Sequence, residues 1–475
     1  MVSPRPLSKK AIRKLSRFLL IISKRTKRMN TPICDFVKAY QQRHTLRLHM
    51  PGHKGRSFLG AEPWDITEID GADELYHARG IIRESEENAA RLFGAGKTIY
   101  STEGSSLCIR AMVYLALLWG KENGRKPLIL AGRNSHKAFL SAAALLSADV
   151  TWLYPEKENH LISCDISVGY LEQALLHMRD KPCAVYITSP DYLGHIADIE
   201  ALSEVCRRYD VLLLVDNAHG AYLKFLPEDR HPLTLGADLC CDSAHKTLPV
   251  LTGGAYLHIR QNAPASLTED AEEAMALFAS SSPSYLILQS LDQCNAYLAE
   301  AYPESLSLLI RRISCMKENL QSHGWKIEGE EAIKLTIMPK EFGYTGDALH
   351  QLLRENNMEC EFSDPDFLTI MFTLELSDEE LNRLESFLLT IPRKPPISVP
   401  MPPLPHPQKA ISIREAVLSP KCEIPVEEAL GAVLADAHVS CPPCIPIIAS
   451  GEIIDEAALT CFRYYGIETC RIVKA

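Results

Sequence analysis

The residues best able to do chemistry stand near the middle of the chain, where Lys246 lies between His245 and Thr247 and closely follows Ser243. A lysine amine can hold an aldehyde as a Schiff base, and neighbouring hydroxyls and backbone N–H groups can bind a phosphate on the same molecule. This pairing predicts pyridoxal phosphate as a cofactor. A solvated surface lysine beside hydroxyl residues would give the same local sequence, so the prediction needs support from other segments.

Asp216 ends an aliphatic run at 211–216 that predicts a strand buried on both faces of a parallel sheet. Ligands of open α/β sheets bind at the carboxyl ends of the strands. A carboxylate in that place can pair with a protonated pyridine nitrogen and keep the ring cationic. An aspartate at a strand end can also simply cap the next turn, so Asp216 alone does not decide between the two interpretations.

Two further segments have polar residues where a cofactor would need them. The Gly- and Ser-rich turn at 104–106 precedes an apolar stretch at 107–119 that is long enough for a buried helix. The free N–H groups of such a helix start attract an anion, whereas an ordinary helix cap would need only one serine. His136 follows a strand expected at 127–131, from where its ring could lie over a flat ligand.

On these and other segments the chain resembles the Orn/Lys/Arg decarboxylase family, bacterial pyridoxal phosphate enzymes with the aspartate aminotransferase type of fold. Nine matches in the same order exclude chance agreement. They are 49–55 (HMPGHKG), 69–75 (IDGADEL), 86–95 (EENAARLFGA), the turn at Gly104, 133–137 (RNSHK), 189–194 (SPDYLG), 215–221 (VDNAHGA), 243–248 (SAHKTL) and 281–285 (SSPSY).

The resemblance implies a role for each matching site residue, and no metal is expected among them. Lys246 would bind the cofactor as a Schiff base, and Asp216 would pair with its pyridine nitrogen. His136 would stack on one face of the ring, while Ala218 packs on the other. His219 would stand beside the cofactor as a further catalytic candidate. The residues implied around the phosphate are Gly104, Ser105, Ser106, Ser243, His245 and, from a neighbouring subunit, Ser281.

The activity that the resemblance implies is decarboxylation of a basic amino acid to its amine, within polyamine metabolism. Arginine is the first choice, ahead of lysine and ornithine, because the chain resembles the compact members that lack an N-terminal regulatory wing. Acidic side chains must neutralise the far end of such a substrate, although the sequence does not identify them. Two other hypotheses share Lys246 and Asp216: another pyridoxal phosphate enzyme, such as an aminotransferase or lyase, and a catalytically silent paralogue.

Five positions depart from the family's usual pattern. Asn217 and Tyr222 replace a glutamate and a histidine, and Glu103 brings a negative charge near the expected phosphate, which it should repel unless it points away. Cys444 replaces a glycine that has a freer backbone, and Ser450 replaces a proline, in a loop expected to help close the site. These are the positions at which the site could differ from those of its relatives.

Composition favours a cytoplasmic enzyme. The chain has 475 residues, 46% of them hydrophobic, and a formal charge of -10, which argues against nucleic acid as a partner. Its fifteen cysteines come without a secretory context, so reduced thiols are expected, and the pair Cys441 and Cys444 is interpreted as part of a structural loop. No membrane partner is expected, and the resemblance implies a homodimer or larger homo-oligomer with shared active sites.

The predicted fold class is α/β, the pyridoxal phosphate-dependent transferase fold type I. It has a large, mixed, mostly parallel sheet, a smaller α+β domain and a C-terminal α+β domain. The expected parts are a basic, disordered extension at 1–28, an arm at 29–64, a large cofactor-binding domain at 65–300, a small domain at 301–391, a Pro-rich linker at 392–407 and a C-terminal domain at 408–475. In the small domain, helices are predicted at 304–323, 345–356 and 378–389, and strands at 333–338 and 367–374.

Overall fold

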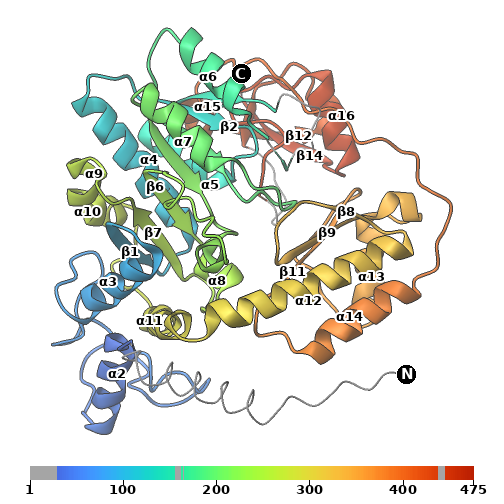
Figure 1. The fold of residues 1–475 in the computed structure, drawn as a ribbon. Coiled ribbons are helices and arrows are strands. Elements are labelled where there is room, and N and C mark those ends of the chain that lie inside the picture. Colours follow the sequence, from blue (N-terminus) through green and yellow to red (C-terminus); the bar gives the residue numbers. More distant parts are fainter. Residues whose placement is uncertain (1–28, 156–161, 164, 437–443, 475) are drawn as a thin grey trace, which may run out of the picture.

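The described part of the chain folds around three separate β-sheets, each with its own helices (Figure 1). The computed structural model describes residues 29–155, 162–163, 165–436 and 444–474. The predicted disordered extension at 1–28 and the predicted loop residue Cys441 lie outside these ranges. Ahead of the first sheet, helix α2 spans Pro32–Gln42.

The largest sheet has seven strands, of which β7 is antiparallel to both of its neighbours and the other pairs are parallel. This is the mixed, mostly parallel sheet that the sequence predicts. In spatial order the strands are β1 (Lys97–Ser101), β7 (Ala255–Ile259), β6 (Leu239–Asp242), β5 (Leu212–Asp216), β4 (Ala184–Thr188), β2 (Leu128–Gly132) and β3 (Asp149–Leu153).

Strand β5 is buried on both faces, as its aliphatic run predicts. Leu212 and Leu214 pack in one hydrophobic cluster with residues of α4 and α5, whereas Leu213 and Val215 pack in a second cluster with residues of α6 and α7. Side chains alternate between the faces of a strand, so helices on both sides require a continuous apolar run. Asp216 is the last residue of the strand and lies at the edge where ligands of such sheets bind.

Most helices of this part cover the large sheet. The helix predicted at 107–119 is α4 and is longer at both ends, so that it begins directly after Gly104. The helices are α3 (Ile81–Phe93), α4 (Ser105–Glu122), α5 (Lys137–Leu146), α6 (Val168–His177), α7 (Ile199–Arg208), α8 (Ala244–Thr247), α9 (Ala265–Glu269), α10 (Ala271–Ala276) and α11 (Tyr285–Ala299), with the 3-10 helix η1 at Ala221–Phe225.

The second sheet is antiparallel and has the order β10-β11-β9-β8. The long helix α12 runs from the large sheet towards it (Figure 1). Every element predicted for this region is present, although β11 is shorter than expected. The elements are α12 (Tyr302–His323), β8 (Lys326–Glu328), β9 (Lys334–Met338), η2 (Pro339–Phe342), α13 (Gly346–Glu355), β10 (Phe362–Ser363), β11 (Leu368–Met371) and α14 (Asp378–Thr390).

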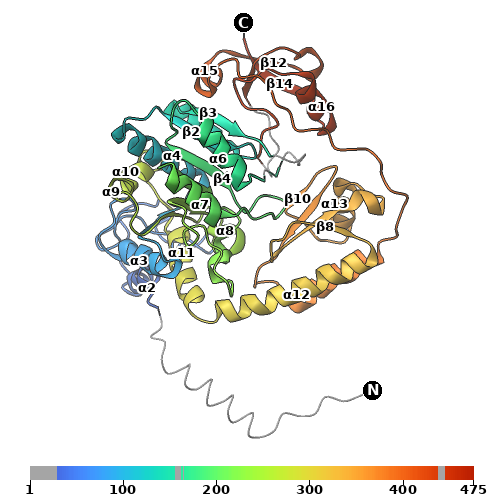
Figure 2. The same cartoon turned by 45° about the horizontal axis from the view of Figure 1, so that its top comes forward.

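The third sheet, β12-β14-β13, follows a segment at 392–407 that contains no helix or strand. It lies beside the β2 and β3 end of the large sheet, while the second sheet lies on another side (Figure 2). Arg414 donates to the backbone oxygen of Ala144 in α5 at 2.9 Å, which joins the two parts. The elements are α15 (Ile413–Leu418), β12 (Lys421–Pro425), η3 (Val426–Glu428), β13 (Leu434–Asp436), α16 (Glu456–Tyr464) and β14 (Thr469–Val473).

Two observations concern the cysteines and the helices of the described residues. The thirteen cysteines in the described part of the chain are all free thiols. Among the described residues, no helix is both long and apolar enough to cross a membrane.

Candidate active site

A cavity of about 330 Å³ lies at the carboxyl ends of β4 and β5 and collects nearly all of the predicted cofactor residues. Ser281 is the exception and does not line the cavity of its own chain. The predicted residues that line it are Gly104, Ser105, Ser106, His136, Asp216, Ala218, His219, Ser243, His245 and Lys246.

Lys246 reaches this cavity from the short helix α8, which follows β6 directly. Its Nζ atom lies 2.9 Å from Nε2 of His219. Burial lowers the pKa of Lys246, although the negative charges of Asp216 and Glu361 oppose this effect. A lowered pKa increases the fraction of neutral amine at neutral pH, and the neutral amine is the form that attacks an aldehyde.

Asp216 is only 2% exposed, and three donors orient its carboxylate, among them Sγ of Cys241, which donates to Oδ1 at 3.6 Å. The hydroxyl of Tyr186, on the neighbouring strand β4, donates to Oδ2 at 3.0 Å, and the N–H of Ala218 donates to Oδ1 at 3.3 Å. The carboxylate is therefore fixed at the strand end, in the cavity that Lys246 also lines. If Asp216 only capped the turn after β5, it would not need to line the same cavity as Lys246.

His136 caps the start of α5, and this contact fixes the state of its ring. Its Nδ1 accepts from the N–H of Ala138 at 3.1 Å, so the neutral ring carries its proton on Nε2. Burial lowers the pKa of His136 from 6.5 to about 4. The side chain therefore presents an uncharged planar ring to the cavity at neutral pH, which suits stacking on a flat ligand.

The start of α4 forms the polar end of the cavity. Gly104 has φ +75°, in the left-handed region that favours glycine, and its N–H donates to Gly253 at 2.7 Å. Ser243 donates to the hydroxyl of Ser105 at 2.8 Å, so two polar segments meet there. Hydroxyls beside the N-terminus of an 18-residue helix form a suitable anion site.

Glu103 also lines this cavity, but its carboxylate is partly engaged elsewhere. Its Oε1 accepts from the backbone N–H of Ser280 at 2.7 Å. The negative charge that the sequence places in the phosphate turn is therefore held by the segment before α11. This contact reduces the conflict with an anion that the sequence predicts.

Two polar atoms that line the cavity show that its walls fit a polar ligand. Nδ2 of Asn134 and Oγ1 of Thr188 are buried and have no hydrogen-bond partner among the described residues. Buried polar atoms are normally paired, so both indicate a bound group that supplies the partner. Together with the amine of Lys246, the carboxylate of Asp216 and the serines of α4, these atoms fit pyridoxal phosphate, which carries an aldehyde, a ring nitrogen, a hydroxyl and a phosphate.

Sequence reasoning missed an acidic residue that the second sheet brings near the site. Glu361 precedes β10, is half-buried and accepts from the hydroxyl of Tyr192 at 2.8 Å. Tyr192 lines the cavity, and the charge of Glu361 acts on both Lys246 and His245. No local pattern around Glu361 could have identified it, because it reaches the site only through the packing of the second sheet against the first.

The segment after residue 443 also closes on the cavity, through Ile445. The backbone oxygen of Cys444 accepts from the N–H of Lys137 at 2.9 Å, and buried Arg133 donates to Ile447 at 3.0 Å. Cys444 has φ +58°, a left-handed conformation that costs a side-chain-bearing residue more than glycine. Cys444 therefore adopts the left-handed backbone conformation that the glycine usual at this position would favour.

The departure at Asn217 belongs to a buried polar cluster behind the cavity. Nδ2 of Asn217 donates to Oδ1 of Asp242 at 2.6 Å, and Oδ2 of Asp242 lies 3.0 Å from Nε2 of His231 and 3.3 Å from Nε2 of His258. Burial opposes ionisation of Asp242, but the two histidines outweigh it and hold the pKa of this carboxyl below its usual range. The cluster joins the end of β5, which carries Asp216, to the end of β6, which is followed by Ser243.

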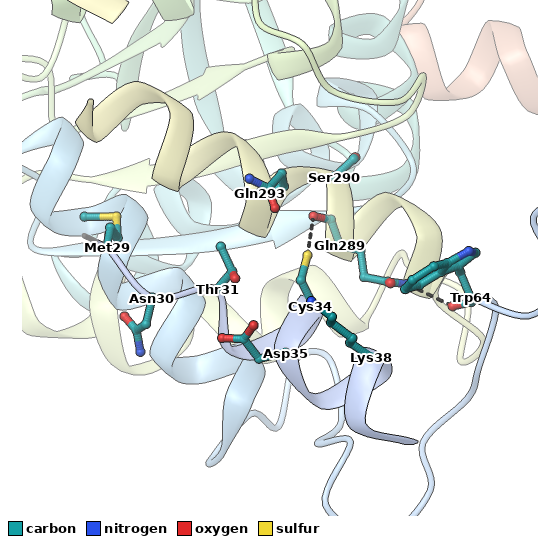
Figure 3. A pocket seen from close by; sticks show the side chains of 10 residues that line it. All are labelled: Met29, Asn30, Thr31, Cys34, Asp35, Lys38, Trp64, Gln289, Ser290 and Gln293. Carbon is teal, nitrogen blue, oxygen red and sulfur yellow. Dashed lines mark hydrogen bonds between the residues drawn. The ribbon is translucent and has the colours of Figure 1, made fainter. Parts of the chain in front are cut away.

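A larger hollow of about 610 Å³ lies between α2 and α11 and contains none of the predicted site residues. Figure 3 shows Cys34 within it, donating through Sγ to the backbone oxygen of Gln289 at 3.3 Å. Burial and the nearby charge of Asp292 raise the pKa of Cys34 to about 12. The thiol therefore stays protonated at neutral pH, and the hollow lacks a reactive nucleophile at this position.

Comparison with known proteins places these features in a family. Residues 31–339 match the family described as "Orn/Lys/Arg decarboxylase, major domain". An arginine decarboxylase of Bacillus subtilis is 30% identical, over 90% of this chain and 91% of the relative. An arginine decarboxylase of Halalkalibacterium halodurans is 29% identical, over 91% of this chain and 93% of the relative.

Solved structures support the fold. A lysine decarboxylase of Francisella novicida matches with a TM-score of 0.76 at 17% identity, over 98% of this chain and 82% of that chain. The constitutive lysine decarboxylase of E. coli matches with a TM-score of 0.75 at 17% identity, over 98% and 85% of the two chains. The likeness confirms the predicted fold class, the pyridoxal phosphate-dependent fold type I.

The lowered pKa of His136 predicts a pH dependence of stability in cofactor-free protein. Folding favours the neutral ring, so its stabilising effect is complete above pH 6.5 and is lost as the pH falls towards about 4. Between pH 6.5 and about pH 4, the free energy of unfolding falls by about 3 kcal/mol because of this histidine. The variant His136→Asn replaces the capping Nδ1 by an amide oxygen and does not titrate, so its urea midpoint should fall less between pH 7 and pH 4.5 than that of the wild type.

The exposed residue His177 provides the control, because His177→Asn should leave the wild-type pH slope unchanged. An unaltered slope in His136→Asn would contradict the buried neutral state of His136.

Proposed function

The chain belongs to the Orn/Lys/Arg decarboxylase family and is a pyridoxal phosphate-dependent decarboxylase of basic amino acids, and from this premise we propose that its substrate is arginine. The single observation that carries the choice is the similarity to arginine decarboxylases along nearly the whole chain. Three of them are 29–30% identical over 90% or more of this chain. The lysine decarboxylase of Pseudomonas aeruginosa is 24% identical over only 58% of it.

In the proposed site, each wall of the cavity holds one part of the cofactor. Lys246 would be the attachment point for its aldehyde carbon, and Asp216 would favour a proton on the ring nitrogen. His136 and Ala218 would contact the ring. The residues proposed to hold the phosphate are Gly104, Ser105, Ser106, Ser243 and His245, with His219 beside Lys246 and Ser281 contributed by a second subunit.

When bound, pyridoxal phosphate supplies the electron sink that accepts the pair left behind as carbon dioxide departs. The protein contributes a buried carboxylate at Asp216, whose charge favours a protonated ring nitrogen over a neutral one. Lys246 would contribute the amine that holds the aldehyde of the cofactor in the absence of substrate. The burial of Lys246 and Asp216 limits the access of water to the reacting atoms, so that side reactions with water are reduced.

Glu361 is the proposed partner of the substrate's guanidinium. Its charge acts on Lys246, and its carboxylate accepts a hydrogen bond from Tyr192, which lines the cavity. A carboxylate can accept two parallel N–H bonds from a guanidinium, whereas an ammonium offers a single point charge. Glu361 therefore supplies the acidic group that a basic substrate needs.

We further propose that the enzyme acts in the cytoplasm as a homodimer and serves polyamine synthesis. Several apolar side chains of the arm are largely exposed, namely Leu46 (78%), Leu48 (84%), Phe58 (79%) and Leu59 (95%). Such a group of exposed apolar residues favours burial against another surface, and a second copy of the chain suits the role proposed for Ser281. The motif at 49–55 lies in the same arm and does not line the cavity of its own chain.

A substrate panel tests the function directly. Purified protein loaded with pyridoxal phosphate should release carbon dioxide from arginine and form the corresponding amine, with kcat/KM at least about tenfold higher than for lysine or ornithine, as a bidentate contact predicts. Product amines are identified by chromatography and mass spectrometry. Preference for lysine or ornithine would refute arginine as the substrate, and keto acid formation would indicate an aminotransferase.

Replacing Glu361 should weaken substrate recognition. Loss of a charge-assisted hydrogen bond predicts that Glu361→Gln lowers kcat/KM for arginine by about 10- to 100-fold. Glu359→Gln is a matched control, because Glu359 is two residues away and forms an ion pair with Arg354 on the surface. Equal effects of the two variants, or none, would exclude Glu361 as the recognition group.

Replacing Lys246 tests the attachment of the cofactor. Lys246→Ala has no amine to bind an aldehyde, so both the visible absorbance of the protein-bound cofactor and the turnover should disappear. An exposed lysine provides the control, because Lys121→Ala, in the last turn of α4 and outside the cavity, should retain both. Turnover in Lys246→Ala would show that another residue performs this role.

A further inference from the structure

A second buried lysine lies next to the proposed reaction centre and belongs to a different sheet. Lys334 begins β9 of the second sheet, and its side chain is 1% exposed. Its Nζ atom lies 3.3 Å from Nδ1 of His219, 3.0 Å from the backbone oxygen of Asp191 and 2.6 Å from Oε2 of Glu331. Lys334 therefore touches the histidine that contacts Lys246.

These contacts determine the direction of the hydrogen bonds. An ammonium has three N–H donors and no acceptor, and three acceptors surround the one on Lys334. Nδ1 of His219 must then be unprotonated and accept. A neutral imidazole has one proton, which must be on Nε2. Because Nε2 lies 2.9 Å from Nζ of Lys246, His219 donates a hydrogen bond to that nitrogen whenever the nitrogen is uncharged.

The surroundings of His219 disfavour a second proton. Burial lowers the pKa of His219 well below 6.5, and the positive charge of Lys334, together with that of Lys246 in its protonated form, adds to this effect. A proton on Nδ1 would also point at the ammonium of Lys334. His219 is therefore a fixed neutral donor, and the edge of the Tyr192 ring, with centroids 4.8 Å apart, limits its rotation.

Glu331 allows Lys334 to keep its charge in the interior. Oε2 of Glu331 lies 2.6 Å from Nζ and supplies the counter-charge that a buried ammonium needs, although burial raises the pKa of Glu331. Tyr222 lies against Glu331, and both burial and this carboxylate raise the pKa of the tyrosine hydroxyl. The hydroxyl therefore stays protonated, so the departure at Tyr222 adds no further charge to the cluster.

We propose that Lys334 is a positioning residue that holds His219 in the tautomer with its proton on Nε2, so that His219 presents a hydrogen-bond donor to the nitrogen of Lys246. The proposal rests on the proposed role of Lys246 as the attachment point of the cofactor. It also gives the second sheet a direct part in the site, since correct packing of β9 is needed to place the ammonium.

Nuclear magnetic resonance of the full-length protein tests the tautomer. With ¹⁵N-labelled histidine and bound pyridoxal phosphate, two-bond ¹⁵N–¹H spectra identify which ring nitrogen of His219 carries the proton, and the variant His219→Asn assigns the signal. The wild type should show Nε2 protonated and Nδ1 unprotonated, both with and without cofactor. A proton on Nδ1 would overturn the proposal.

Lys334→Met removes the donor to Nδ1 and should give a mixture of His219 tautomers, with kcat lowered about tenfold and KM for arginine within about twofold of wild type. Lys317→Met is the matched control, because Lys317 donates to the backbone oxygen of Glu331 at 2.9 Å and is a cation of the same cluster. It should leave the tautomer and kcat unchanged. An unchanged tautomer in Lys334→Met, or equal effects of the two variants, would refute the role of Lys334.

If Lys334→Met does not fold, Lys334→Arg provides a second test of the proposal. The guanidinium keeps the charge and the donors, so the Nε2 tautomer should persist, and loss of that tautomer in a folded Lys334→Arg protein would count against the proposal. The tautomer is read without any substrate. A wild type with the expected tautomer that decarboxylated no basic amino acid would refute the proposed function and leave this inference intact.

Discussion

The burial of an amine at Lys246 is the constraint on which the rest of the site depends. A lysine removed from water tends to lose its charge, and a neutral amine is the reactive form. Asp216 and Glu361 both favour the charged form, but burial outweighs them and the pKa of Lys246 is lowered. The site therefore combines carboxylates for a cationic ligand with a lysine whose pKa is lowered by burial.

Closing that cavity requires three sheets. The large sheet supplies Lys246 and Asp216 at neighbouring strand ends, where the geometry of parallel strands brings them together. The second sheet contributes Lys334 and the segment with Glu361, and the C-terminal part contributes Ile445. A site assembled in this way excludes water only when all three parts are in place, so packing between the sheets is part of the chemistry.

The sequence predicts the parts of the site that depend on local pattern. An apolar run that ends in Asp216, and a polar turn before an apolar helix, each place a chemical group relative to its own element. Glu361 and Lys334 depend instead on how two sheets pack, which no local pattern encodes. Lys334 stands inside a correctly predicted strand, but alternation alone does not identify a buried lysine that contacts a histidine of another sheet.

Asn217, which stands where a glutamate is usual in the family, suggests how the segments that carry Asp216 and Ser243 are held at a fixed distance from each other. Asn217 follows Asp216, and its partner Asp242 precedes Ser243, so a single hydrogen bond of 2.6 Å joins the segment proposed to hold the ring nitrogen to the segment proposed to hold the phosphate. A glutamate at this position would place a second carboxylate against Asp242, and two buried carboxylates repel unless one is protonated. Asn217 and Asp242 therefore form a matched pair, in which the amide donates to a carboxylate that also lies within 3.3 Å of ring nitrogens of His231 and His258.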